Sequence, residues 1–170
     1  MAIWEVGDNM LFNKIKESAK NGKVKVFFDM DGVLVEYRII QEEEFDKVGF
    51  YEGLRPLKTN LAFAKKLSKI KNVEVCILSN CRTKQHKADK LKWLKTFAPF
   101  IKQENINIIC YEEIENFDKS KKSVVKSELI LDKLKKEKFK AYHIEDDTNI
   151  IKIEKTMPNI NIIHVSSLIK

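Results

Sequence analysis

Two aspartates separated by one residue, Asp29 and Asp31, have the spacing in this chain that most directly suggests chemistry. They follow an apolar run from Val24 to Phe28, which is typical of a buried strand. Side chains at i and i+2 project to the same side, and two carboxylates held that close repel each other. Unless they share a proton they need a cation, and an all-oxygen site suits Mg²⁺. Gly32 follows at once and lets the backbone turn away from a bound ligand.

The same residues have a simpler interpretation as a turn. Asp31-Gly32 between two apolar alternating runs is a strong signal for a type I′ β-hairpin. A calcium-binding EF-hand loop is disfavoured, because Val33 and Leu34 stand where that loop needs an acidic or amide residue and a glycine. The metal site, unlike the hairpin, requires that other reactive side chains lie at the ends of later strands.

Helices and strands are expected to alternate along the chain. Strands of this length that alternate with helices predict βαβ units. The fold class is therefore α/β, with a Rossmann-like, doubly wound parallel sheet of about five strands and helices on both faces. We expect strands at 24–28, 73–78, 106–110, 141–144 and 160–165, and helices at 10–19, from a cap at Thr59 or Asn60 to 71–72, and at 84–97, 121–138 and 149–155.

The length of 170 residues fits one domain of ordinary size. We expect an N-terminal helical extension over residues 1–22 and the main domain over 23–170. A small cap insert is expected at about 35–56, with an extended arm at 33–40 and a polar helical turn at 41–48.

Polar residues follow two of the later strands. Ser79 and Asn80 follow the strand at 73–78, and Glu145, Asp146 and Asp147 follow the strand at 141–144. Ligands of parallel α/β sheets bind beyond the carboxyl ends of the strands, so these residues are expected to meet Asp29 and Asp31. A lone hairpin does not explain this coincidence.

Composition limits the other possibilities. The net charge is +7, with lysines spread along helices, which is typical of a solvated surface and also attracts phosphate-bearing ligands. The odd count of three cysteines and the lack of a signal peptide or membrane span indicate a cytoplasmic protein with no membrane partner. The spacing of cysteines and histidines does not match a zinc site, so we interpret all six as structural.

Three motifs together resemble a known family. Asp29-Met30-Asp31-Gly32-Val33, Ser79 after an apolar strand, and Glu145-Asp146 after another are similar, in order, to motifs one, two and four of the haloacid dehalogenase-like (HAD) hydrolase superfamily. The similarity covers about residues 24–165. Stretches at 49–56 and 90–94 are similar to the 5′(3′)-deoxyribonucleotidase branch of that family.

The resemblance implies a phosphatase with an aspartyl-phosphate intermediate. Asp29 is then the nucleophile and Asp31 the general acid and base, with its backbone carbonyl as a metal ligand. Ser79, with Asn80, Gly32 and neighbouring amides, is expected to hold the phosphoryl oxygens. Asp29, Asp31 and Asp146 are the expected Mg²⁺ ligands.

Two assignments stay open at this stage. The lysine that neutralises the phosphoryl group is either Lys122 or Lys126, and Lys122 is slightly preferred. Asp146 pairs either with Glu145 or with Asp147, and Asp147 serves equally well as a helix cap.

The expected partner is a small phosphorylated substrate, with a nucleoside monophosphate favoured by the deoxyribonucleotidase-like stretches. Phe45, Phe50 or Tyr51 then stacks on the base, whereas Trp93 is expected in the core. One alternative is a phosphatase that acts on nucleic-acid 3′ ends, which the basic charge favours. Another is a binding or regulatory module of the same fold without turnover.

Overall fold

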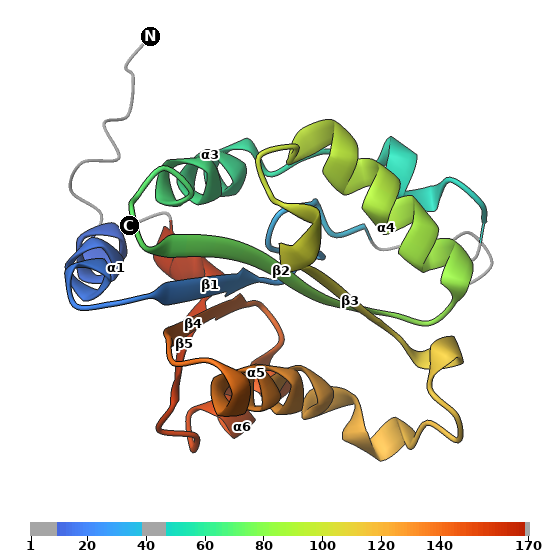
Figure 1. Ribbon diagram of the computed structural model, residues 1–170. Coiled ribbons are helices and arrows are strands. Elements are labelled where there is room, and N and C mark those ends of the chain that lie inside the picture. Colours follow the sequence, from blue (N-terminus) through green and yellow to red (C-terminus); the bar gives the residue numbers. More distant parts are fainter. Residues whose placement is uncertain (1–9, 39–46, 169–170) are drawn as a thin grey trace, which may run out of the picture.

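The computed structural model describes residues 10–38 and 47–168. Its centre is a five-stranded parallel sheet in the order β3-β2-β1-β4-β5 (Figure 1), which confirms the predicted fold class. The strands are β1 (Val24–Phe28), β2 (Val73–Cys81), β3 (Ile106–Cys110), β4 (Lys140–Glu145) and β5 (Ile160–His164). The main helices are α1 (Met10–Lys20), α3 (Lys58–Leu67), α4 (Lys84–Phe97), α5 (Val125–Lys136) and α6 (Thr148–Glu154).

Helices cover both faces of the sheet, with α3 and α4 on one face and α5 and α6 on the other (Figure 1). The alternation of side chains along β1 serves both faces, because Val26 and Phe28 pack in a core with α1, α3 and α4, while Phe27 packs with α5. All three of these side chains are fully buried. None of the helices in the two described ranges has both the length and the apolar character that a membrane crossing needs.

The hairpin interpretation of Asp31-Gly32 is wrong. β1 pairs in parallel with β2 on one side and β4 on the other, so the chain does not fold back on it. After β1 the backbone forms a compact turn, in which the carbonyl of Met30 accepts bonds from the N–H groups of Leu34 at 2.8 Å and Val35 at 3.0 Å. The extended arm expected at 33–40 is therefore wrong at its beginning.

The segment after this turn packs against α4. It contains the short 3₁₀ helix η2 (Phe50–Gly53), and Trp93 of α4 donates its indole N–H to the carbonyl of Leu54 at 3.1 Å. Trp93 is 2% exposed, which confirms its expected place in the core. Phe45 and most of the helical turn expected at 41–48 lie outside the described residues, and the small cap at 35–56 stays a prediction.

Several element boundaries differ from the expected ones. Neither Thr59 nor Asn60 caps α3, which begins at Lys58; instead the Asn60 amide donates to the carbonyl of Val33 at 2.6 Å and fastens the turn after β1. β2 continues to Cys81 because its last residues pair with β3. The helix expected from residue 121 begins instead as a 3₁₀ turn, η5 (Lys119–Ser123), and becomes α5 at Val125.

Candidate active site

The predicted strand-end residues converge at one cavity of about 630 Å³. The cavity lies at the carboxyl ends of the strands around β1, where the chain order switches from β2 on one side to β4 on the other. Its lining includes Asp29, Asp31, Asn80, Lys126, Glu145, Asp146 and Asp147. The fold thus brings together segments that are more than a hundred residues apart in the sequence.

Three carboxylates in this cavity are close enough to share one metal ion. Asp29, Glu145 and Asp146 each offer an oxygen, and these atoms lie within 4.8 Å of one another. Such an all-oxygen donor set fits a hard divalent cation. The side chain of Asp31, which the sequence grouped with the metal ligands, does not belong to this cluster, and the role expected for its backbone carbonyl stays a prediction.

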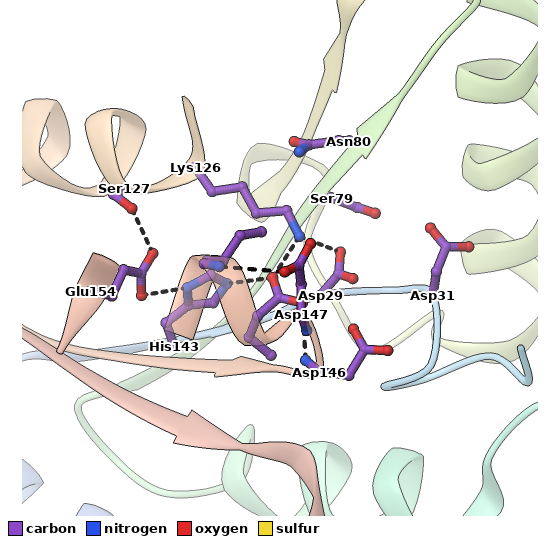
Figure 2. A network of polar contacts seen from close by, with 12 residues as sticks. Asp29, Asp31, Ser79, Asn80, Lys126, Ser127, His143, Asp146, Asp147 and Glu154 are labelled. Carbon is purple, nitrogen blue, oxygen red and sulfur yellow. Dashed lines mark hydrogen bonds and ion pairs between the residues drawn. The ribbon is translucent and has the colours of Figure 1, made fainter. Parts of the chain in front are cut away.

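Lys126 contacts two of these carboxylates. Its Nζ lies 2.8 Å from Oδ1 of Asp29 and 2.7 Å from Oε2 of Glu145, and the side chain is 3% exposed. Figure 2 shows Lys126 and Asp29 pointing toward one another. Lys122, the lysine preferred from the sequence, is exposed and its Nζ lies 5.6 Å from the ring centre of Tyr111. The structure therefore favours Lys126, rather than Lys122, as the lysine that contacts Asp29.

Burial and neighbouring charges set the charge states of this cluster. Burial of Lys126 opposes its charge, but the carboxylates of Asp29 and Glu145 outweigh burial and raise the pKa of the ammonium. Burial also opposes ionisation of Asp29, yet the charges of Lys126 and Lys90 hold its pKa below the usual value. Burial, together with the charge of Asp29, raises the pKa of Glu145 to about 7. Asp29 is thus the carboxylate that stays ionised.

Gly32 fits closely under Asp146. Its φ of +69° lies in the left-handed region, and a Cβ at this position would stand 2.2 Å from Oδ2 of Asp146. Glycine is therefore favoured here by the backbone conformation, and a side chain would displace the carboxylate of Asp146. The contribution of Gly32 to substrate binding stays a prediction.

Asp31 lies outside this carboxylate cluster and lines the cavity, with 32% of its side chain exposed. Its Oδ1 accepts a hydrogen bond from the hydroxyl of Tyr51 at 2.9 Å, and its Oδ2 accepts one from the ammonium of Lys90 at 2.5 Å. Burial, and then the charge of Asp31, raises the pKa of Tyr51, so this hydroxyl remains a donor. Two donors therefore fix the carboxyl group of Asp31.

Lys90 was not among the residues predicted for the site. This lysine of α4 is fully buried and also donates to Oγ of Ser79 at 2.8 Å and to the backbone carbonyl of Asn80 at 2.7 Å. A signal existed in the helical period, because Lys90 lies four residues after His86 and three before Trp93, and both of these are buried. Because the helix contains several other lysines, this signal did not distinguish Lys90 from them.

Ser79 and Asn80, the two residues of β2 that were expected to bind phosphate, differ in their access to the cavity. Asn80 lines the cavity. Ser79 is fully buried, and its hydroxyl accepts the hydrogen bond from Lys90. The role of Ser79 toward the phosphoryl oxygens therefore stays a prediction.

The three acidic residues at the end of β4 have different contacts. Asp147 caps α6, because its Oδ1 accepts hydrogen bonds from the backbone N–H of Asn149 at 2.7 Å and of Ile150 at 3.4 Å. Glu145 accepts through Oε1 from the backbone N–H groups of Asp146 and Asp147. The pairing of Glu145 with Asp146 is thus the one that the structure contains.

His143, Glu154 and Ser127 form a chain of buried polar groups (Figure 2). Nε2 of His143 lies 3.6 Å from Oε2 of Glu145, and its Nδ1 lies 2.8 Å from Oε2 of Glu154. The hydroxyl of Ser127 donates to Oε1 of Glu154 at 2.9 Å. All four side chains are fully buried, which agrees with the sequence-based interpretation of His143 as structural.

Comparisons with known proteins identify the fold alone. No protein-family model matches the sequence, and no curated protein matches it. Among solved structures, the chain is similar to one in the Pnkp1/Rnl/Hen1 RNA repair complex, with a TM-score of 0.64 and 12% identity over 85% of this chain. The match covers 42% of the other chain, so this protein spans about two fifths of its length.

Proposed function

We propose that this protein is a Mg²⁺-dependent phosphomonoester hydrolase that works through an aspartyl-phosphate intermediate. The observation that carries the proposal is the position of Asp29. Its buried carboxylate lies 2.8 Å from the ammonium of Lys126 and close to the potential metal ligands Glu145 and Asp146, in the lining of an open cavity. Together with the resemblance to the HAD superfamily, this arrangement supports phosphoryl transfer.

Asp29 is the nucleophile in this proposal. Its carboxylate stays ionised because of Lys126 and Lys90, and a carboxylate oxygen is able to attack phosphorus. The new bond joins Oδ of Asp29 to phosphorus, and the bond from phosphorus to the leaving oxygen breaks. Lys126 supplies positive charge beside the phosphoryl oxygens, as cationic residues do in other phosphoryl-transfer sites.

Asp31 moves the protons. In the first step it gives a proton to the leaving alkoxide, and in the second it takes a proton from the water that attacks the aspartyl-phosphate. The products are an alcohol and inorganic phosphate, and Asp29 is regenerated. The bonds from Tyr51 and Lys90 hold the Asp31 carboxyl group in place at the cavity wall for both transfers.

Asp29, Glu145 and Asp146 fit a Mg²⁺ ion by number, spacing and oxygen chemistry. When bound, the ion offsets the negative charge of the phosphoryl group and of the carboxylates. The raised pKa values of Glu145 and Asp146, which follow from burial and from nearby carboxylate charge, indicate that this cluster favours an added cation.

Turnover of p-nitrophenyl phosphate with and without Mg²⁺ tests the proposal. We expect release of nitrophenolate that requires Mg²⁺ and stops with EDTA. Turnover that is indifferent to EDTA would refute the metal role, and no turnover of any phosphate ester would favour a binding module without catalysis.

Nucleotides are the substrate class that the cavity lining favours, since Tyr37 and Phe50 offer aromatic surfaces beside the carboxylates. Action on nucleic-acid ends is a second candidate. The net charge of +7 favours it, and the similar solved chain belongs to an RNA repair complex. A panel of nucleoside monophosphates and 3′-phosphorylated oligonucleotides separates the two.

A further inference from the structure

Arginine is rare in this chain and is concentrated near the cavity. Of 32 basic residues only three are arginines, Arg38, Arg55 and Arg82, and two of them, Arg38 and Arg82, line the cavity. The planar guanidinium binds phosphate with two parallel hydrogen bonds, which the ammonium of lysine does not. Arginines at this cavity are therefore suited to directed contact with a phosphate group.

Arg38 is held in place at the cavity wall. Its Nε and Nη2 form an ion pair with Oε1 of Glu36, at 3.0 Å and 2.9 Å, and its Nη2 also donates to the carbonyl of Gly53 at 3.0 Å. These bonds orient the guanidinium, while 46% of the side chain stays exposed. A fixed guanidinium loses less freedom when it binds an anion than a mobile side chain does.

Arg82 reaches the same cavity from another segment. It directly follows β2 and is exposed, whereas Arg38 comes from the segment after β1. Lys126 already lies between Asp29 and Glu145, where the reacting phosphoryl group binds in the proposed mechanism. Arg82 and Arg38, of which Arg38 is paired with Glu36, are thus guanidinium groups at the cavity that the removal of one phosphate does not require.

An exposed aromatic side chain adjoins Arg38. Tyr37 also lines the cavity, and 75% of it is exposed, so it is not part of the core. Aromatic faces of this kind stack on nucleobases without selecting among them. The cavity of about 630 Å³ has room for a ligand much larger than inorganic phosphate.

We propose that Arg38 and Arg82 bind a second phosphate group of the substrate while Tyr37 stacks on its base. This inference rests on the proposed function, because it takes the reacting phosphate to lie at Asp29. The substrate class is then a nucleotide with two phosphate groups. The second group is either the other phosphate of a nucleoside bisphosphate or the phosphodiester next to a polynucleotide end.

The test compares kcat/KM for the 3′-phosphate, the 5′-phosphate and the 3′,5′-bisphosphate of one nucleoside. We expect the bisphosphate to exceed the better monophosphate by about tenfold or more, because charged hydrogen bonds to the second phosphate are added. Arg38→Gln and Arg82→Gln should each bring this ratio toward one. Arg55→Gln is the matched control, since Arg55 is exposed outside the cavity lining, and it should keep the ratio.

A ratio near one in the unaltered protein, or a ratio that both variants leave intact, would overturn the inference. A short oligonucleotide with a terminal phosphate identifies the source of the second group. Faster turnover of the oligonucleotide points to a polynucleotide end, faster turnover of the bisphosphate points to the small molecule, and both results support the subsite.

Failure of the proposed function is recognised separately, by the lack of turnover of p-nitrophenyl phosphate. The subsite is then tested by binding, through the rise in melting temperature that each nucleotide produces. A larger rise with the bisphosphate that disappears in Arg38→Gln and Arg82→Gln supports the subsite. Equal rises with bisphosphate and monophosphate contradict it.

Discussion

The ammonium of Lys126 lies 2.8 Å from Oδ1 of Asp29, and both side chains are more than nine-tenths buried. This ion pair joins the beginning of α5 to the end of β1, across almost a hundred residues of sequence. It keeps a buried carboxylate ionised at the point where the cavity opens, as a nucleophile requires.

Removal of Lys126 should destabilise the protein. Lys126→Met leaves the buried carboxylates of Asp29 and Glu145 without their shared cation, and we expect the free energy of unfolding to fall by about 3 kcal/mol. Denaturant unfolding measures this loss, and added Mg²⁺ should recover part of it. Lys122→Met is the matched control and should change stability by less than about 0.5 kcal/mol, since Lys122 is exposed. Equal losses in the two variants would contradict the assignment.

A side chain at position 32 should destabilise the protein and displace Asp146. Gly32→Ala places a Cβ 2.2 Å from Oδ2 of Asp146 at a φ of +69°, so we expect a loss of stability of about 1–2 kcal/mol from the backbone alone. Displacement of Asp146 should also weaken Mg²⁺ binding by about tenfold or more in calorimetry. Gly53→Ala serves as the control, because a Cβ at Gly53 meets nothing within 4 Å. Unchanged Mg²⁺ affinity in Gly32→Ala would remove Asp146 from the metal site.

Lys90 should act through Asp31. Lys90→Met removes one of the two donors that fix the Asp31 carboxyl group, so proton transfer to the leaving group should suffer. We expect about 100-fold slower turnover of an alkyl phosphate, and a smaller loss with p-nitrophenyl phosphate, whose leaving group needs little protonation. Lys92→Met changes an exposed lysine of the same helix and provides the baseline. Equal losses on both substrates would indicate a structural role alone.

Glu145 should make stability depend on pH. Because burial raises its pKa from 4.5 to about 7, the folded protein holds a proton that the unfolded chain releases between these values. The stability of the unaltered protein relative to Glu145→Gln should therefore fall as pH rises through this window. Mg²⁺ competes with that proton, so it should raise the melting temperature more at pH 8 than at pH 5. A difference between the two proteins that is constant with pH would contradict the raised pKa.

Local patterns predicted most of the fold. α4 at 84–97 and β3 at 106–110 have the expected bounds, because their apolar periodicity and flanking residues are unambiguous. The residues that line the cavity from the strand ends could also be predicted, because the carboxyl ends of parallel strands share one edge of the sheet.

Lysines were the residues that the sequence could not place. Lys122 and Lys126 both lie near a helix start, but Lys122 lies in the 3₁₀ turn η5, whereas Lys126 lies in the first turn of α5 and contacts Asp29. Lys90 differs from the other lysines of α4 in that it is buried. Its burial depends on how the segment after β1 packs against α4. Contacts between distant segments, rather than local propensity, assign these roles.

The most direct test of the account is to trap the covalent intermediate. Asp31→Asn should still accept the phosphoryl group from p-nitrophenyl phosphate but should lose the base that activates water, so phosphorylated protein accumulates. Mass spectrometry after rapid acid quench should find one phosphoryl group on the peptide that contains Asp29, and none when Asp29→Asn is added. Turnover without any phosphorylated protein, or a phosphoryl group on another residue, would contradict the role of Asp29.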